Sequence, residues 1–210
     1  MPLFLQNTEL TNRWGIWKID ETLEELLAAL PRQEVYRQEM ERFTAPRRRQ
    51  EWLAVRVLLY VMLGEEKRIA YHPNDKPYLT DGSASISISH TKDYVAVLLG
   101  PCGVEVGIDI EQYGDRVQKI AHKFMREDEK PTLYQDTEVW SLLLHWSAKE
   151  TLFKCINASE VNFREHLHIL PFITDQQGIF SAQEYRTEKK CTFSIHYYLY
   201  PDFVLTMNLS

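Results

Sequence analysis

The sequence predicts an α+β fold made of two similar halves, each with antiparallel strands and a long packed helix. Segments with helical spacing of apolar residues come first, strand-like segments follow, and the same order then repeats. Short turns join successive strands of the first half, which favours antiparallel pairing. No polar linker separates the halves, so we place the boundary before the best-defined strand and divide the chain into residues 1–103 and 104–210.

The composition is that of an ordinary globular protein and excludes several classes of function. The 210 residues are 44% hydrophobic and 26% charged, and the net charge of −6 argues against general nucleic-acid binding. No run approaches the roughly 18 apolar residues of a membrane span, and the N-terminus does not resemble a signal peptide. The three cysteines are widely spaced, so we expect them to be reduced. We therefore expect a cytoplasmic protein without nucleic-acid or membrane partners.

In the first half, an early strand is followed by helices and then by a run of further strands. We expect a strand within residues 3–19, helices over residues 22–30, 31–43 and 46–62, and strands over residues 69–71, 76–79, 85–90 and 94–99. Pro46 suits the first turn of the third helix, and Gly64 suits its end. This helix is apolar around much of its circumference, so it should be buried centrally.

Arginines give that third helix one polar side. Arg48, Trp52 and Arg56 are spaced i, i+4 and i+8, so they share a helix face. One interpretation is a binding site for an anion, most simply a phosphate group. The other is that the arginine stems only cover apolar neighbours, and the sequence favours neither interpretation.

The second half begins with the best-defined strand. We expect this strand over residues 104–111, helices over residues 115–129 and 137–157, and strands over residues 167–173, 179–185, 192–200 and 203–209. Asp136 is the expected N-cap of the longer helix.

Two carboxylates lie on one face of the strand at residues 104–111. Side chains alternate along a strand, so Asp109 and Glu111 point to the same side, about 7 Å apart, opposite the face of Val106 and Ile108. Such a pair suits Mg²⁺ or Mn²⁺, and Gly107 would let a bulky group approach the backbone. Taken alone, however, an Asp-x-Glu pair is more often a solvated strand face.

A second charged group lies within the longer helix. Glu150 and Lys154 are i, i+4 neighbours and can form an ordinary helical ion pair. The preceding turns are strongly apolar, so this helix should be packed in the core. Charges on a packed helix need partners, and Lys149, Glu150 and Lys154 are therefore candidate site residues.

Four motifs together resemble those of the 4′-phosphopantetheinyl transferases, in particular the larger, surfactin-synthetase-type members. Residues 107–111 are similar to G-[IV]-D-[IVL]-E, and residues 146–154 to W-[SCT]-x-K-E-x-x-x-K. Residues 87–91 are similar to S-x-S-H-[ST], and Lys76-Pro77 to G-K-P, with Asp75 where glycine is usual. The chain length fits the pseudo-dimeric members, so the resemblance implies a monomer whose two halves pack as a pseudo-dimer.

The resemblance also implies a reaction. The phosphopantetheine arm of coenzyme A, the co-substrate, would move to a serine of an apo acyl or peptidyl carrier protein, with release of adenosine 3′,5′-bisphosphate. Asp109, Glu111 and Glu150 would hold Mg²⁺, with Mn²⁺ as an alternative. Glu150, or a water it orients, would take the serine proton, while Lys149 and Lys154 would neutralise the diphosphate.

The remaining implied contacts are with the nucleotide part of coenzyme A. Lys76, Ser89 and His90 would contact the adenosine, the 3′-phosphate and the diphosphate. The resemblance also implies basic residues in the early helices that would bind the 3′-phosphate, but no lysine matches there. Arg48 is the best substitute, followed by Arg37, Arg42 and Arg56.

Two other functions fit parts of the pattern. A non-catalytic coenzyme A or nucleotide-binding module would keep the motifs as a scaffold, but all three expected metal ligands and Lys154 are intact. A Mg²⁺-dependent phosphohydrolase would need a way to activate water, and the sequence offers none. Because three carboxylates around an empty site repel one another, we also expect Asp109→Asn to stabilise the protein without metal, or to cost little.

Overall fold

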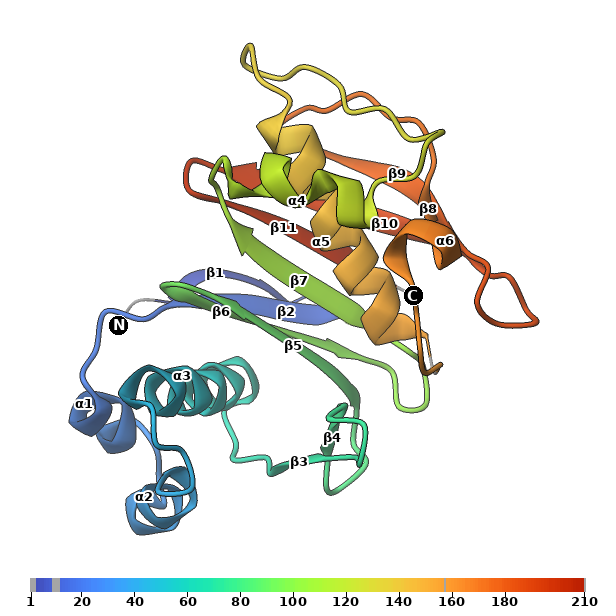
Figure 1. Ribbon diagram of the computed structural model, residues 1–210. Coiled ribbons are helices and arrows are strands. Elements are labelled where there is room, and N and C mark those ends of the chain that lie inside the picture. The colour runs from blue at the N-terminus through green and yellow to red at the C-terminus, as the bar shows by residue number, and fades with distance from the viewer. Residues whose placement is uncertain (1–2, 9–11, 157, 210) are drawn as a thin grey trace. The chain divides into compact units, whose positions relative to one another are not determined.

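The computed structural model describes residues 3–8, 12–156 and 158–209. The chain forms two compact units, Met1–Val104 and Glu105–Ser210, each described here by itself (Figure 1). Each unit has an antiparallel sheet with helices packed on it, which confirms the predicted α+β class. Within the described ranges, none of the helices has both the length and the apolar character required to cross a membrane.

The sheet of the N-terminal unit has the strand order β1-β2-β6-β5, with every neighbouring pair antiparallel. Its strands are β1 (Leu3–Thr8), β2 (Arg13–Lys18), β5 (Ser85–Thr91) and β6 (Tyr94–Gly100). A separate small hairpin pairs β3 (Ile69–Tyr71) with β4 (Pro77–Leu79). The helices α1 (Leu23–Ala28), α2 (Gln33–Met40) and α3 (Pro46–Leu63) lie on one side of the larger sheet (Figure 1).

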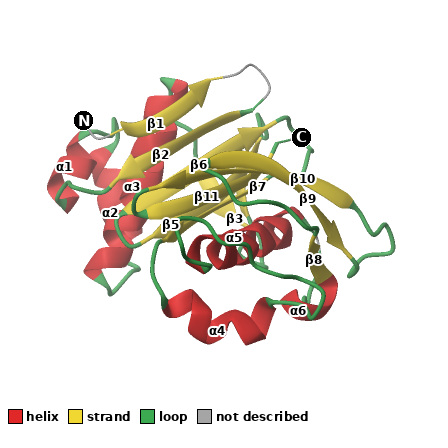
Figure 2. Cartoon of the chain, turned by 90° about the horizontal axis from the view of Figure 1, so that it is seen from above, coloured by secondary structure: helices red, strands yellow, loops and turns green. Residues whose placement is uncertain are grey.

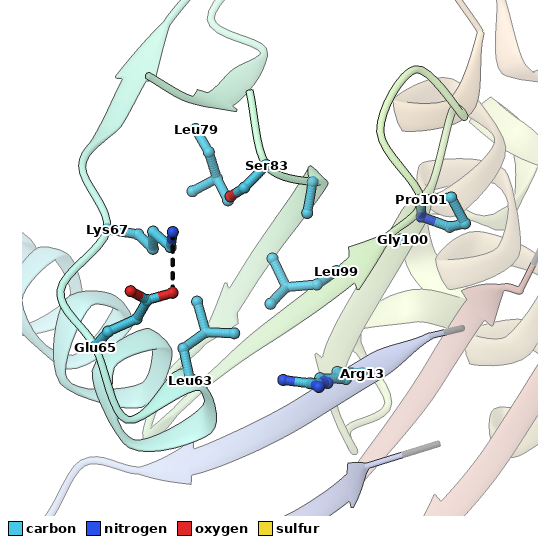
Figure 3. A pocket seen from close by; sticks show the side chains of 10 residues that line it. Arg13, Leu63, Glu65, Lys67, Leu79, Ser83, Leu99, Gly100 and Pro101 are labelled. Atoms are coloured by element: carbon cyan, nitrogen blue, oxygen red, sulfur yellow. Dashed lines mark ion pairs between the residues drawn. The ribbon is translucent and has the colours of Figure 1, made fainter. Parts of the chain in front are cut away.

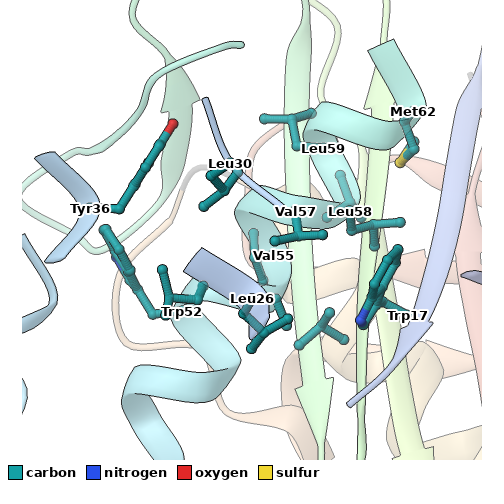
Figure 4. Packing of buried hydrophobic residues seen from close by; sticks show 14 of the residues in the cluster. Trp17, Leu26, Leu30, Tyr36, Trp52, Val55, Val57, Leu58, Leu59 and Met62 are labelled. Atoms are coloured by element: carbon teal, nitrogen blue, oxygen red, sulfur yellow. The ribbon is translucent and has the colours of Figure 1, made fainter. Parts of the chain in front are cut away.

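Helix α3 is the centre of this unit, as its apolar circumference predicts. Pro46 occupies the first turn, and the helix ends at Gly64, whose φ of 70° lies in the left-handed region that glycine adopts readily. The helix packs against β2 and β6 and against α1. Figure 4 shows the resulting core, to which α3 contributes Trp52, Val55, Val57, Leu58, Leu59 and Met62.

The sheet of the C-terminal unit has the order β7-β11-β10-β9-β8, again antiparallel throughout. Its strands are β7 (Gly107–Gln112), β8 (Leu167–Ile169), β9 (Gln177–Glu184), β10 (Thr192–Tyr200) and β11 (Phe203–Asn208). The long helix α5 (Val139–Cys155) packs mainly on β7 and β11, with α4 (Arg116–Phe124) and α6 (Phe163–His166) nearby (Figure 2). Strand β7 and helix α5 carry the two main predicted motifs.

Several element boundaries differ from the sequence prediction. The helix expected over residues 115–129 ends at Phe124, and the strand expected from residue 104 begins at Gly107. Helix α5 begins at Val139 with Glu138 as its cap residue, so the prediction of Asp136 as N-cap is wrong. Asp136 instead has a φ of 59°, whereas an N-cap residue normally has extended backbone.

Candidate active site

Strand β7 and helix α5 approach each other unusually closely at Gly107. A Cβ atom at this position would lie 2.3 Å from the carbonyl oxygen of Thr151 and 2.7 Å from Sγ of Cys155. The space that the sequence analysis assigned to a bulky ligand is therefore filled by α5 itself. Because it has no side chain, Gly107 lets the strand and the helix pack closely and so brings the two motifs together.

Asp109 is buried in this contact, with 4% of its surface exposed. Ser147 Oγ donates a hydrogen bond to Oδ2 over 2.8 Å, and Lys154 Nζ donates to Oδ1 over 2.8 Å and to the Ile108 carbonyl oxygen over 2.7 Å. Ser147 Oγ also lies 2.8 Å from Oγ1 of Thr206 on β11. Asp109 therefore does not belong to a solvated strand face, and helix α5 supplies its counter-charge.

Glu111 and Glu150 have strongly perturbed acidities. Burial, and then the negative charge of Asp109, raise the pKa of Glu111 to about 7, although the indole of Trp146 donates to its Oε1 over 2.7 Å. The same two causes raise the pKa of Glu150 to about 7, while the Lys154 ammonium acts in the opposite direction. The negative charge of Asp109 thus disfavours ionisation of both glutamates. A bound cation would offset this repulsion and stabilise the ionised carboxylates.

The chemistry of these donors suits a hard divalent cation, because Mg²⁺ prefers carboxylate oxygens. Residues 3–8, 12–156 and 158–209 nevertheless include no three His, Cys, Asp or Glu side chains that already converge as a metal cluster. Lys154 meanwhile holds a positive charge against Asp109. Asp109, Glu111 and Glu150 therefore fit the expected metal in donor type, and the metal site itself stays a prediction.

Lys149 lies in a different environment from its neighbour Glu150. Its side chain is fully buried and forms an ion pair with the equally buried Glu129, with Nζ 2.8 Å from Oε2. Nζ also donates to the carbonyl oxygens of Phe124 over 2.7 Å and Phe163 over 3.2 Å. An ammonium group has three donors, and these bonds use all of them. The expectation that Lys149 contacts a diphosphate is therefore wrong for this structure.

In the N-terminal unit, α3 and β5 bring Arg48 and His90 together although they are 42 positions apart. The guanidinium Nη1 of Arg48 donates to His90 Nε2 over 2.6 Å, and the carboxylate of Glu51 lies 3.4 Å from Arg48 and 3.8 Å from the other ring nitrogen. Both side chains are substantially exposed. Two residues that the sequence analysis assigned to one 3′-phosphate are thus direct neighbours.

Lys76 and Ser89 also belong to this unit. Lys76 lies in the turn between β3 and β4, where its backbone N–H donates to Oδ1 of Asn74 over 3.3 Å. Asp75 precedes it with a φ of 62°, a left-handed conformation that glycine adopts more easily than other residues. This explains why glycine suits the position and how aspartate can replace it. Ser89 is buried on β5, paired with Ala96 of β6.

The other arginines considered for the anion site have structural partners. Arg56 is buried, its guanidinium lies 3.5 Å from the ring centroid of Trp52, and Nη1 donates to the Trp52 carbonyl oxygen. Arg37 pairs with Glu24, and Arg42 lies over the ring of Phe43. The predicted arginine stripe on α3 is therefore interrupted by buried residues, and Arg48 is its exposed member.

A cavity of about 390 Å³ lies elsewhere in the N-terminal unit (Figure 3). Leu63, Leu79 and Leu99 line it together with Arg13, Glu65 and Lys67, and Lys67 is ion-paired with Glu65. None of the predicted site residues lines this cavity.

Two buried residues near the candidate site, Glu129 and Thr206, were not predicted from the sequence. Glu129 is the buried partner of Lys149. The hydroxyl group of Thr206 is hydrogen-bonded to those of Ser147 and Thr151, and its Oγ1 lies 2.7 Å from Oγ1 of Thr151. The apolar character of α5 indicated that a charge on it needs a partner, but it did not indicate which residue. The alternation of side chains along the last strand does not show that Thr206 binds polar groups of the site rather than only filling the core.

A comparison with protein families found a similarity within the C-terminal unit. Residues 105–207 match the model of the 4′-phosphopantetheinyl transferase superfamily, an interval that contains β7, α5 and all of the C-terminal sheet except Asn208 at the end of β11. A search of curated proteins found no match to the chain. The matched interval includes Asp109, Glu111, Glu150 and Lys154. Over residues 105–207 the chain is therefore similar to the 4′-phosphopantetheinyl transferase superfamily.

Proposed function

We propose that this protein transfers the 4′-phosphopantetheine arm of coenzyme A to a serine of an apo acyl or peptidyl carrier protein and releases adenosine 3′,5′-bisphosphate. The resemblance to the larger, surfactin-synthetase-type transferases makes this proposal specific. One observation supports it most: in the matched domain, Glu111 and Glu150 both have a pKa raised to about 7 beside the buried Asp109. Phosphoryl-group transfer depends mainly on positioning and on neutralising charge, and this group of residues offers both.

Asp109, Glu111 and Glu150 would hold Mg²⁺, or Mn²⁺ in its place. Bound there, the metal would neutralise negative charge on the diphosphate of coenzyme A. Trp146 fixes one glutamate by its bond to Oε1 of Glu111, and Ser147 fixes Asp109. The ligands would thus be oriented by residues of α5 that do not themselves bind the metal.

Glu150, or a water it orients, would accept the proton of the acceptor serine. A carboxyl group with a pKa of about 7 is half ionised near neutral pH, which suits a general base. Lys154 would neutralise the negative charge that develops on the leaving adenosine 3′,5′-bisphosphate as the diphosphate linkage of coenzyme A breaks. Its bonds to Asp109 and Ile108 use two of the three donors of an ammonium group.

The N-terminal unit would supply contacts to the nucleotide. Arg48 and His90 would bind the 3′-phosphate, and Lys76 and Ser89 would contact the adenosine and the diphosphate. The 2.6 Å contact between Arg48 and His90 supports the first assignment, because it places the two side chains close enough to bind one phosphate group together.

Intact mass spectrometry of candidate acceptors tests the proposed function. The protein is incubated with coenzyme A, Mg²⁺ and a panel of apo carrier proteins from fatty-acid, polyketide and peptide synthesis. We expect at least one acceptor to gain the mass of one phosphopantetheinyl group, and its Ser→Ala variant to gain nothing. If no carrier protein is modified while a transferase control modifies the same panel, the proposal is wrong.

A further inference from the structure

We propose that the buried ion pair of Lys149 and Glu129 is a positioning device for Glu111. The pair holds the backbone of Phe124 and Phe163, whose rings contact the Trp146 indole, and the indole N–H donates a hydrogen bond to Glu111. Lys149 would thus act through Trp146 rather than touch coenzyme A. The catalytic consequence rests on the proposed function, whereas the geometry can be tested without it.

The first link is between the ion pair and the chain around it. Glu129 Oε2 accepts from Lys149 Nζ and from the backbone N–H of Arg126, both over 2.8 Å, and Oε1 accepts from the N–H of Ile169 over 2.7 Å. The pair therefore joins α5 to the segment after α4 and to β8. Both side chains have an exposure of 0%, so removing either one leaves a buried charge without its partner.

The second link is between Lys149 and the two phenylalanines. Besides Glu129, the ammonium group binds the carbonyl oxygens of Phe124 and Phe163, which lie in separate segments of the chain. The rings of these two residues contact the Trp146 indole, with centroid distances of 5.3 Å for Phe124 and 5.6 Å for Phe163. One ammonium group thus fixes the backbone of both aromatic neighbours of Trp146.

The third link reaches the candidate active site. Trp146 Nε1 donates to Oε1 of Glu111 over 2.7 Å, so the position of the indole determines where one carboxylate oxygen lies. Trp146 and Lys149 are three positions apart on α5 and therefore lie on neighbouring parts of its surface. A displacement of Phe124 or Phe163 would move the indole and, with it, Glu111. An error of about 1 Å in a catalytic group can reduce a rate on the order of 100-fold.

The experiment compares Lys149→Met, Glu129→Gln and the double variant with a control. The control is Glu184→Gln, because Glu184 is equally buried and accepts hydrogen bonds from Thr187 and Cys191 but has no link to Trp146. The primary readout is the ¹H–¹⁵N resonance of the Trp146 indole, assigned with Trp146→Phe and recorded well below each unfolding temperature. The second readout is kcat and KM for coenzyme A.

We expect Lys149→Met to shift or broaden the Trp146 indole resonance, to lower kcat about 10- to 100-fold and to leave KM for coenzyme A within about twofold. Glu184→Gln should lower the unfolding temperature without moving that resonance. The double variant leaves no unpaired buried charge, so its indole resonance should be closer to wild type than that of Lys149→Met. It also carries the test if the single variant does not fold.

Two results would overturn the proposal. An unchanged Trp146 resonance, with a loss of stability like that of Glu184→Gln, would make the ion pair a purely structural element. A large rise in KM with kcat unchanged would instead make Lys149 a coenzyme A contact. Because the resonance needs no substrate, a wild-type protein without transferase activity would refute the proposed function and still leave the positioning role measurable.

Discussion

Lys154 Nζ lies 2.8 Å from Oδ1 of Asp109, so the most buried carboxylate of the candidate active site already has a cationic partner. Asp109 also accepts a hydrogen bond from Ser147. Glu111 and Glu150 differ from it, because burial and the charge of Asp109 raise the pKa of both. The three carboxylates, which the sequence presents as equivalent ligands, therefore have different roles in stability.

The first prediction compares Asp109→Asn with Glu111→Gln in the presence of a chelator at pH 8. Repulsion alone suggested that Asp109→Asn would stabilise the protein, but the bonds of Asp109 to Lys154 and Ser147 reverse that expectation. Losing a charge-assisted hydrogen bond should cost about 1.5 to 3 kcal/mol. Glu111→Gln should raise the unfolding temperature, because it removes a raised-pKa carboxylate and keeps an acceptor for Trp146. Thermal unfolding measures both, and changes of the same sign would contradict the prediction.

The second prediction concerns the pH dependence of stability without metal. Glu111 and Glu150 have a pKa of about 7 when folded and an ordinary value of 4.5, so between these values the folded state holds protons that the unfolded state has released. Their contribution to stability is therefore full below about pH 4.5 and is lost as the pH rises to about 7. As the pH rises over this range, the unfolding temperature of Glu111→Gln should decrease less than that of wild type. The exposed Glu188→Gln serves as control, and parallel profiles for all three proteins would refute the assignment.

The third prediction concerns the contact between β7 and α5. Gly107→Ala should destabilise the protein by at least about 1 to 3 kcal/mol, because the new Cβ meets the backbone oxygen of Thr151, which cannot rotate away. Gly114→Ala is the matched control, since a Cβ there meets nothing within 4 Å. Chemical denaturation measures the difference. Equal stability of the two variants would show that the strand and helix are not packed this closely.

Comparison of the structure with the sequence predictions shows which features the sequence alone determines. The fold class and the central position of α3 follow from periodicity and capping residues, whereas the meeting of β7 with α5 was implied by the resemblance of their motifs. The roles of Lys149 and Gly107 did not follow, because a buried ion pair with Glu129 and a close backbone contact with Thr151 depend on tertiary packing. Asp136 was misassigned because aspartate is favoured both at helix N-caps and in turns with left-handed backbone, and Asp136 occupies such a turn.

The fourth prediction concerns the anion site in the N-terminal unit. Arg48→Ala and His90→Ala should each weaken binding of coenzyme A about 10- to 100-fold, and binding of 3′-dephospho-coenzyme A much less. Arg47→Ala is the control: it removes a neighbouring charge that pairs with Asp93 and Glu51. Calorimetric titration with both ligands measures the effect. Equal losses for the two ligands would separate Arg48 and His90 from the 3′-phosphate, and a similar loss for Arg47→Ala would indicate a general charge effect.

The most direct test of the central claim is single-turnover transfer by wild type, Asp109→Asn and Glu150→Gln, followed by intact mass spectrometry with and without Mg²⁺. Circular dichroism and thermal unfolding first establish that each variant is folded at the assay temperature. We predict that wild type modifies the acceptor serine only with Mg²⁺ and that both folded variants are slower by orders of magnitude, because each lacks a charge that the transfer requires. A folded Asp109→Asn variant that transfers at nearly the wild-type rate would contradict the assignment of the active site to β7 and α5.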